Sequence, residues 1–289
     1  MTTAIKMSKL QDVPQAYQPC IELEHKSATF SKTHSISQEI FIQMEQKQVQ
    51  ATNYIFNIKL ENLRKNFISW LFIISPRLNF SKLTLFNTVS MMDYLFSRMN
   101  KEDIQESKYF QLFAVVCFFV SFKFYEKKTI SLSFVEKSLL HGKWNETEIR
   151  QAEIFVLEKV DYKIDYINPY SFYQFFELII KSYFEETKVD QISFVFNFVM
   201  QKAIKLVDIV FSLTPLEQAI LILNTTFLFM QNLTDIEIEH YSFFFMEMAN
   251  LTANQHIRQF EKFSSLLINN ITFSEDFLQK LSNIDHIKG

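Results

Sequence analysis

The sequence predicts an all-α fold, and three observations carry this prediction. The 289-residue chain contains only 2 Gly and 5 Pro, whereas sandwiches, Rossmann folds and phosphate-binding loops need many such turn residues. Its hydrophobic content of 48% supplies a sizeable core without a disulfide or metal staple. Its apolar residues recur at intervals of three and four, which is the spacing of an amphipathic helix. We therefore expect long helices joined by short loops.

The first half of the chain is expected to hold an N-terminal tail and six helices. Residues 1–34 are mixed in charge and aperiodic, which is typical of a loosely ordered tail, and a short helix carrying Ile40, Phe41 and Met44 follows. Apolar stripes, N-caps and breakers mark the next elements. They are predicted over residues 57–74 (ended by Pro76), 81–96 (capped by Ser81), 107–125, 133–141 and 147–160 (begun by Asn145 and Glu148). The helix 107–125 is apolar on nearly every side, which predicts that it is central.

A second, similar series begins after Asn168 and Pro169. Thr214 and Glu217 bracket one clear helix start, because their side chains can cap it reciprocally. Helices are predicted over residues 170–183, 191–211, 215–231, 235–248 and 253–269, with a C-terminal helix near 277–284. The order predicts two five-helix units in tandem, with the third helix of each at its centre. The predicted division is a tail over 1–34, an N-terminal helix and first unit over 35–164, and a second unit with the C-terminal helix over 165–289.

Composition and motifs exclude several classes of function. The net charge of −3 shows no basic surplus for nucleic acid. Cys20 and Cys117 cannot form a disulfide framework or a structural zinc site, and the six His are scattered singly. The most apolar stretches, 110–122 and 219–230, are shorter than the roughly 20 residues that a bilayer needs. No catalytic motif is present. We expect a soluble intracellular protein that is not an enzyme and has no metal, cofactor, nucleic-acid or membrane partner.

Four charged residues stand on or beside apolar stripes. Arg64 and Asp93 lie on two successive predicted helices, and Lys123 and Glu153 lie on two later ones. An unpaired buried charge is costly, so each residue should find an opposite charge or an external partner. Two residues of each sign allow two ion pairs. The alternative for any single one is a rim residue whose charged end reaches solvent.

In their order and context these residues resemble the cyclin box. The resemblance is specific over residues 57–176 and architectural over the second half. The segments that carry the resemblance are Met92-Asp93-Tyr94-Leu95, Gln111-Leu112, Phe122-Lys123-Phe124-Tyr125-Glu126 and Gln151-Ala152-Glu153, with Trp70 six residues after Arg64. The five signature positions of the cyclin family match Arg64, Asp93, Leu112, Lys123 and Glu153.

The resemblance implies a role for each residue. Arg64 and Asp93 would form an internal ion pair, with Leu112 in the core of the box. Lys123 and Glu153 would hydrogen-bond a helix of a partner kinase. The apolar surround of that contact is expected to be Phe119, Phe122, Phe124 and Ile154. The implied protein is a regulatory subunit that binds and activates a cyclin-dependent protein kinase as a heterodimer, controls cell-cycle progression, and is found in nucleus and cytoplasm.

A second surface of the family, which docks substrate R-x-L motifs, is altered here. Leu63, Trp70 and Gln111 remain, but the acid expected three residues after the Trp is Ile73. These departures weaken the case for substrate docking. They also keep open an alternative function, a cyclin-fold structural or assembly subunit that binds no kinase. A cyclin-fold transcription factor fits poorly, because such proteins carry a cysteine zinc ribbon and a basic face.

Overall fold

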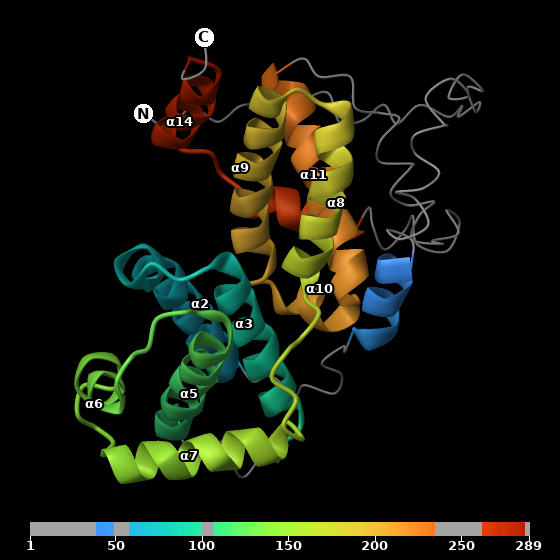
Figure 1. Cartoon of the computed structure of the whole chain (residues 1–289). Helices are drawn as coiled ribbons and strands as arrows, with labels where there is room; N and C mark the ends of the chain where they lie inside the picture. Colours follow the sequence, from blue (N-terminus) through green and yellow to red (C-terminus); the bar gives the residue numbers. More distant parts are fainter. Residues whose placement is uncertain (1–38, 49–57, 100–106, 235–261, 287–289) are drawn as a thin grey trace. The chain divides into compact units, whose positions relative to one another are not determined.

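The computed structural model describes residues 39–48, 58–99, 107–234 and 262–286 (Figure 1). Every regular element in these ranges is a helix, which confirms the all-α prediction. Residues 39–47 are helical, and the compact body considered below begins at Met44. The predicted tail, the predicted helix 235–248 and most of the predicted helix 253–269 lie outside the described residues.

The helices fall into two successive groups. The first group comprises α2 (Ile58–Leu78), α3 (Lys82–Ser97), α5 (Ser107–Tyr125), α6 (Leu132–Phe134), the π-helix η1 (Val135–Leu139) and α7 (Glu146–Lys159). The second comprises α8 (Pro169–Tyr183), α9 (Glu186–Ala203), α10 (Val207–Ser212) and α11 (Pro215–Thr234), followed by helical residues 262–269 and α14 (Glu275–His286).

The most apolar long helix of each group lies at the centre of that group. In the first group α5 packs against α2, α3, η1 and α7, and Figure 1 shows it among them. Its segment from Ala114 to Phe118 is almost completely buried. In the second group α11 packs between α8 and α9, and Ala219 to Leu223 are fully buried. The prediction that the third helix is central holds for α5 in the first group. In the second group the central helix, α11, is the fourth described helix, because the predicted helix 191–211 is divided into α9 and α10.

Side-chain caps begin the helices where the sequence placed them. Ser81 accepts a hydrogen bond from the backbone N–H of Thr84 at 3.2 Å at the start of α3. Asn145 and Glu148 form a reciprocal capping box at the start of α7. Thr214 and Glu217 do the same at the start of α11. Each cap satisfies N–H groups that have no partner inside the helix.

Three predicted boundaries are wrong. The helix predicted to end at residue 74, before Pro76, is longer: α2 includes Pro76 in its last turn and runs on to Leu78. The predicted helix 133–141 is a turn of α-helix followed by a π-helix, and His141 beyond it has a positive φ of 54°. The predicted helix 191–211 is two helices, since α9 ends at Ala203 and α10 starts at Val207. A tertiary contact to the Ile204 carbonyl accompanies that break.

Candidate partner-binding site

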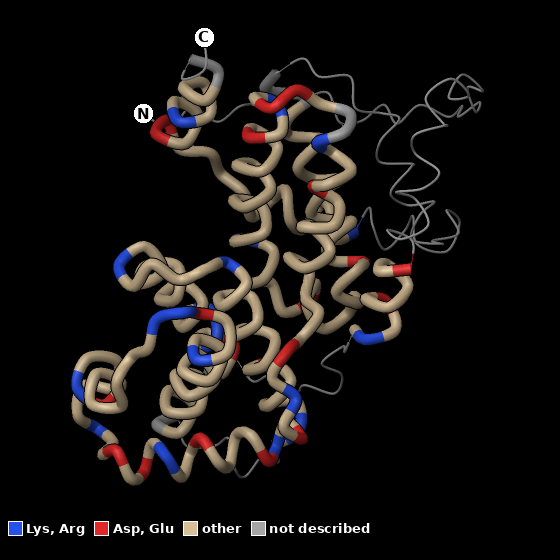
Figure 2. Tube along the Cα trace, in the orientation of Figure 1, with Lys and Arg blue, Asp and Glu red and all other residues tan. Residues whose placement is uncertain are grey.

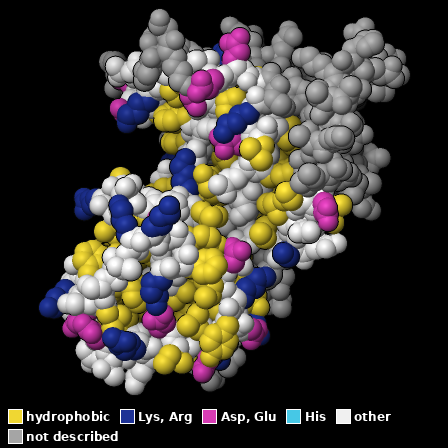
Figure 3. Space-filling model, in the orientation of Figure 1, with side chains coloured by type: hydrophobic (Ala, Val, Ile, Leu, Met, Phe, Trp, Pro, Cys, Tyr) yellow, Lys and Arg dark blue, Asp and Glu magenta, His cyan; other side chains and the backbone are white. Residues whose placement is uncertain are grey.

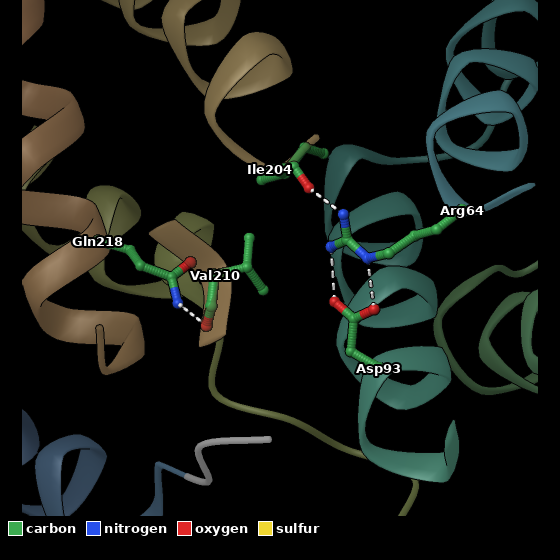
Figure 4. Close-up of polar contacts among 5 residues, drawn as sticks. All are labelled: Arg64, Asp93, Ile204, Val210 and Gln218. Atoms are coloured by element: carbon green, nitrogen blue, oxygen red, sulfur yellow. Dashed lines mark hydrogen bonds and ion pairs between the residues drawn. The ribbon is translucent and has the colours of Figure 1, made fainter. Parts of the chain in front are cut away.

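Arg64 of α2 and Asp93 of α3 meet inside the core (Figure 4). The Arg64 Nε donates to Asp93 Oδ1, and Nη2 donates to Oδ2, each at 2.7 Å. Arg64 is only 1% exposed. A planar guanidinium matches both carboxylate oxygens at once, so the pair joins the two helices in one orientation. The structure therefore brings together the two residues that the sequence suggested as an internal ion pair.

Arg64 also reaches the second group of helices. Its Nη1 donates to the backbone carbonyl of Ile204 at 2.7 Å, at the C-terminal end of α9. The guanidinium lies over the Phe211 ring, 5.7 Å from its centre. The last carbonyls of a helix lack intrahelical partners and attract cations. The third hydrogen bond thus makes Arg64 a joint between α2, α3 and the end of α9, which the sequence did not indicate.

The surroundings of this joint are closed and strongly affect the acidity of nearby groups. Burial raises the pKa of the Asp93 carboxyl, and Arg64 opposes that rise through its charge and hydrogen bonds. Burial, with a smaller contribution from Asp93, also raises the pKa of the Cys117 thiol. A cavity of about 40 Å³ lies beside the pair, with Gln218 on its lining. Both members of the pair are almost completely buried, so this joint is structural.

The second pair joins α5 and α7 at the surface. The Nζ of Lys123, near the end of α5, forms an ion pair with Oε1 of Glu153 on α7. The two side chains are partly exposed. Lys123 Nζ also lies 4.3 Å from the centre of the Phe119 ring, a cation–π contact. The pair is held in place while its polar atoms stay accessible to another molecule.

Two large apolar side chains beside this pair face solvent. Phe124 directly follows Lys123 and is 54% exposed, and Ile154 directly follows Glu153 and is 57% exposed. Exposed large apolar residues adjacent in sequence to an ion pair are features that a protein-binding surface can use. We call Lys123, Glu153, Phe124 and Ile154 the Lys–Glu surface.

The expectation that Phe122 contributes apolar surface is wrong. Phe119 contributes to the site only by supporting Lys123 from below. Phe122 is 1% exposed and packs on Phe118 and Phe80, with ring centres 5.7 and 6.2 Å away. Helix geometry explains this, because residue 122 shares its face with residue 118, which points into the core. Phe119 is 5% exposed and lies under Lys123, so it supports the lysine instead of offering surface.

The remaining predicted residues are divided between the core and a half-buried surface. Leu112 is buried in the core of the first group. Leu63 and Trp70 are half-buried, and Trp70 stacks on Phe67 with ring centres 5.3 Å apart. Gln111 accepts a hydrogen bond from Lys143 Nζ at 3.4 Å.

Sequence reasoning missed two polar residues that hold the first group together. Buried Asn87 of α3 donates to Ser121 Oγ at 3.0 Å and to the Ile164 carbonyl at 2.9 Å, and its Oδ1 accepts from the Tyr166 N–H at 2.9 Å. It thereby fixes the connector between the two groups of helices. An amide at an inward position of an otherwise apolar helix was the available signal.

Glu126 is the second missed residue. Its carboxylate accepts hydrogen bonds from the Ser81 N–H at 2.7 Å and from the Thr84 hydroxyl, and so ties the end of α5 to the start of α3. Partial burial alone would raise its pKa, but these hydrogen bonds and the charge of Lys128 bring the pKa below its usual value. The carboxylate is therefore held in its charged form.

Other kinds of site were sought in the same ranges. Among the described residues, no group of three or more His, Cys, Asp and Glu side chains could hold a metal ion. Within those ranges no helix combines the length and the apolar character needed to cross a membrane. The Lys–Glu surface thus remains the candidate site.

Comparison with known proteins identifies the fold class first. The fold resembles that of a viral cyclin from herpesvirus saimiri, with a TM-score of 0.51, 12% sequence identity, and coverage of 87% of this chain and 97% of that one. At that identity the likeness shows the fold, which is the cyclin fold.

Sequence comparison then gives the family. Residues 37–165 match the family model described as cyclin, N-terminal domain. The chain is 25% identical to S-phase entry cyclin-6 of Saccharomyces cerevisiae over 154 residues, which is 53% of this chain and 38% of the relative. It is 26% identical to G2/mitotic-specific cyclin-1 of the same yeast over 117 residues, 39% of this chain and 24% of the relative. The aligned part is thus well under half of either relative. Over residues 37–165 the chain is therefore similar to the cyclin family, and its overall fold is the cyclin fold.

Proposed function

We propose that this chain is the regulatory subunit of a cyclin-dependent protein kinase, which it binds and activates to control cell-cycle progression. The observation that carries the proposal is the Lys123–Glu153 ion pair, partly exposed and flanked by solvent-facing Phe124 and Ile154. A residue with a purely structural role at either charged position would be apolar, because both lie on otherwise apolar stripes. The match of residues 37–165 to the cyclin N-terminal domain supports the same assignment.

The geometry suggests how such a contact would work. In the free chain Lys123 and Glu153 satisfy each other and water. Against a partner helix, the ammonium can donate to carbonyl groups at the helix end, and the carboxylate can accept from N–H or hydroxyl groups. Phe124 and Ile154 would bury the apolar face of that helix. The kinase would supply all the catalytic groups, so this chain would act as a regulator and not as an enzyme.

The test is reconstitution with a panel of recombinant cyclin-dependent kinases. Binding and peptide phosphorylation would be measured for the parent chain and for Lys123→Ala and Glu153→Ala. Glu158→Ala is the matched control, because Glu158 is an exposed acid on the same helix α7. We expect lost binding and activation for the first two variants with unchanged melting, and parent behaviour for the control.

Full activation by both variants would reject the proposal. Such a result would favour the alternative function, a structural or assembly subunit that uses the cyclin fold without a kinase. The proposal also includes presence in the nucleus and cytoplasm, where its kinase partner would act. Imaging of a tagged chain in the source cells would test that location.

A further inference from the structure

The C-terminal end of α2 and the loop after α5 form a second surface with a different character. An open groove there is lined by Leu78, Thr129, Ile130, Ser131 and Phe134. Three of these residues are apolar and only partly buried, so the floor of the groove is apolar and reachable.

Basic residues stand at the rim of this groove. Arg77 lies in the last turn of α2, immediately before Leu78, and Lys127 and Lys128 precede Thr129 in the loop. All three are exposed. Figure 2 shows basic segments at the end of α2 and on the loop after α5. In Figure 3 Lys and Arg side chains gather on this part of the surface beside hydrophobic ones. We call Arg77, Leu78, Lys127, Lys128, Ile130 and Phe134 the basic groove.

The positive charge of the basic groove is only partly offset by its neighbours. The charged carboxylate of Glu126, which precedes the two lysines, attracts Lys128 while it accepts hydrogen bonds from the Ser81 N–H and the Thr84 hydroxyl, so one negative charge stands against the three positive charges of Arg77, Lys127 and Lys128. In the part of the chain that the structure describes, Arg77, Lys127 and Lys128 take part in no salt bridge. This local surplus of positive charge occurs in a chain whose net charge is −3. The positive charge of the basic groove would repel a basic docking motif and attract an acidic one.

The groove is also held in a fixed shape. Glu126 anchors the start of the loop to the N-terminus of α3, only four residues after Arg77. At its other end the loop enters α6, where Ser131 caps the helix through the N–H of Phe134. A groove that is already ordered loses little conformational entropy when a ligand binds.

From these observations we propose that the basic groove binds a linear peptide segment in which apolar side chains are followed by acidic or phosphorylated residues. The apolar side chains lie on Leu78, Ile130 and Phe134, and the anionic groups lie against Arg77, Lys127 and Lys128. The inference deepens the proposed function, because it names the chemical class of substrate or regulator that the kinase complex would select. The binding step itself requires no kinase.

The experiment measures peptide binding by the full chain alone, using fluorescence anisotropy. The probe is a labelled extended peptide with two phenylalanines followed by four glutamates. Comparison peptides replace the glutamates by phosphoserines, glutamines or lysines. We expect binding of both anionic peptides, weakening as salt rises, and little binding of the glutamine and lysine forms. Tighter binding of the phosphoserine peptide identifies phosphate as the preferred anion; equal binding identifies carboxylates as sufficient.

Variants then locate the binding site. The double change Lys127→Glu and Lys128→Glu should weaken the glutamate peptide by about tenfold or more, since each exposed ion pair contributes modestly and is here reversed. Ile130→Asp, at a partly buried residue of the groove lining, should also weaken it. The matched control is Lys181→Glu with Lys262→Glu, which removes the same charge from exposed sites on the second group of helices. Melting temperatures are recorded for every variant.

Equal weakening by the control double variant would overturn the inference, because it would show attraction to overall charge only. Equal binding of the glutamate and lysine peptides would overturn it too. Lys123→Ala should bind the peptide like the parent chain, so the two proposals fail separately. A chain that activates a kinase but ignores the acidic peptide would refute only the basic groove.

Discussion

Replacing Arg64 with alanine should strongly destabilise the fold. The change removes three hydrogen bonds of 2.7 Å, two to Asp93 and one to the Ile204 carbonyl. Asp93 would remain in the core, 3% exposed, with no cation beside it. Breaking a buried ion pair from one side costs about 3–5 kcal/mol. At about 2–4 °C per kcal/mol for a chain of this size class, the melting temperature should fall by about 6–20 °C.

The assay is thermal and urea unfolding followed by circular dichroism. Lys65→Ala serves as the matched control, because Lys65 is the neighbouring residue on α2 and forms only a surface ion pair with Glu61. Exposed i, i+4 pairs contribute about 0.3–0.5 kcal/mol, so this control should melt within about 2 °C of the parent. If Arg64→Ala also melted within about 2 °C of the parent, Asp93 would have to be solvated in the folded state. The contacts of Arg64 would then contribute nothing measurable to stability.

A double variant separates the ion pair from the third hydrogen bond. Arg64→Met with Asp93→Leu removes both charges and keeps apolar volume, which is often close to neutral for buried pairs. Here recovery should be incomplete, because the Ile204 carbonyl still loses its donor, a loss of about 1–3 kcal/mol if it stays buried. Complete recovery would show that the contact with Ile204 is energetically unimportant.

The pH dependence of Arg64→Ala has a definite sign. In the parent, burial raises the pKa of Asp93 and Arg64 opposes the rise. Without Arg64 the folded-state pKa rises further above the unfolded value, so the folded state holds the proton more tightly. A raised folded pKa stabilises at low pH and loses that contribution as the pH increases. The deficit of Arg64→Ala relative to the parent should therefore shrink between pH 7 and pH 5.

Three further predictions concern the other polar contacts. Lys123→Ala and Glu153→Ala should each weaken kinase binding by about thirty-fold or more, which is a loss of at least about 2 kcal/mol, while the melting temperature stays unchanged. Calorimetric titration with the kinase measures this affinity, and an unaltered affinity would contradict the prediction. Asn87→Leu should lower the free energy of unfolding by about 1–3 kcal/mol, because it leaves the Ile164 carbonyl and the Tyr166 N–H without a hydrogen-bond partner. Faster hydrogen exchange of the Tyr166 amide would show that the effect arises at this contact. Glu126→Gln should be less stable than the parent at neutral pH, where the parent's lowered pKa keeps the carboxylate charged. A lowered folded pKa stabilises above the unfolded pKa and loses that contribution as the pH falls through the folded pKa, so the difference should start to shrink below about pH 4. A difference that stayed constant as the pH was lowered further would refute this.

Much of the fold could be predicted from local sequence. The scarcity of Gly and Pro determined the helical class, and short-range capping chemistry determined where several helices begin, as at Asn145 and Glu148. The cost of a buried charge predicted that Arg64 and Asp93 each need an opposite charge, whereas their pairing with each other was implied by the resemblance to the cyclin box. These inferences succeed because each depends on residues within a few positions of one another, or on the strong cost of one buried charge.

Tertiary structure alone decided the features that depend on which helices meet. The sequence places Phe122 and Phe124 two positions apart in a helix that is apolar on nearly every side, so periodicity cannot tell which faces the core. Packing against Phe80 and Phe118 buries Phe122, whereas Phe124 stays exposed next to the ion pair. The end of α9 at Ala203 likewise accompanies a hydrogen bond from Arg64, 140 residues earlier in the chain. Local sequence specifies the helices and their caps, but contacts between distant segments decide which side chains remain at the surface to bind a partner.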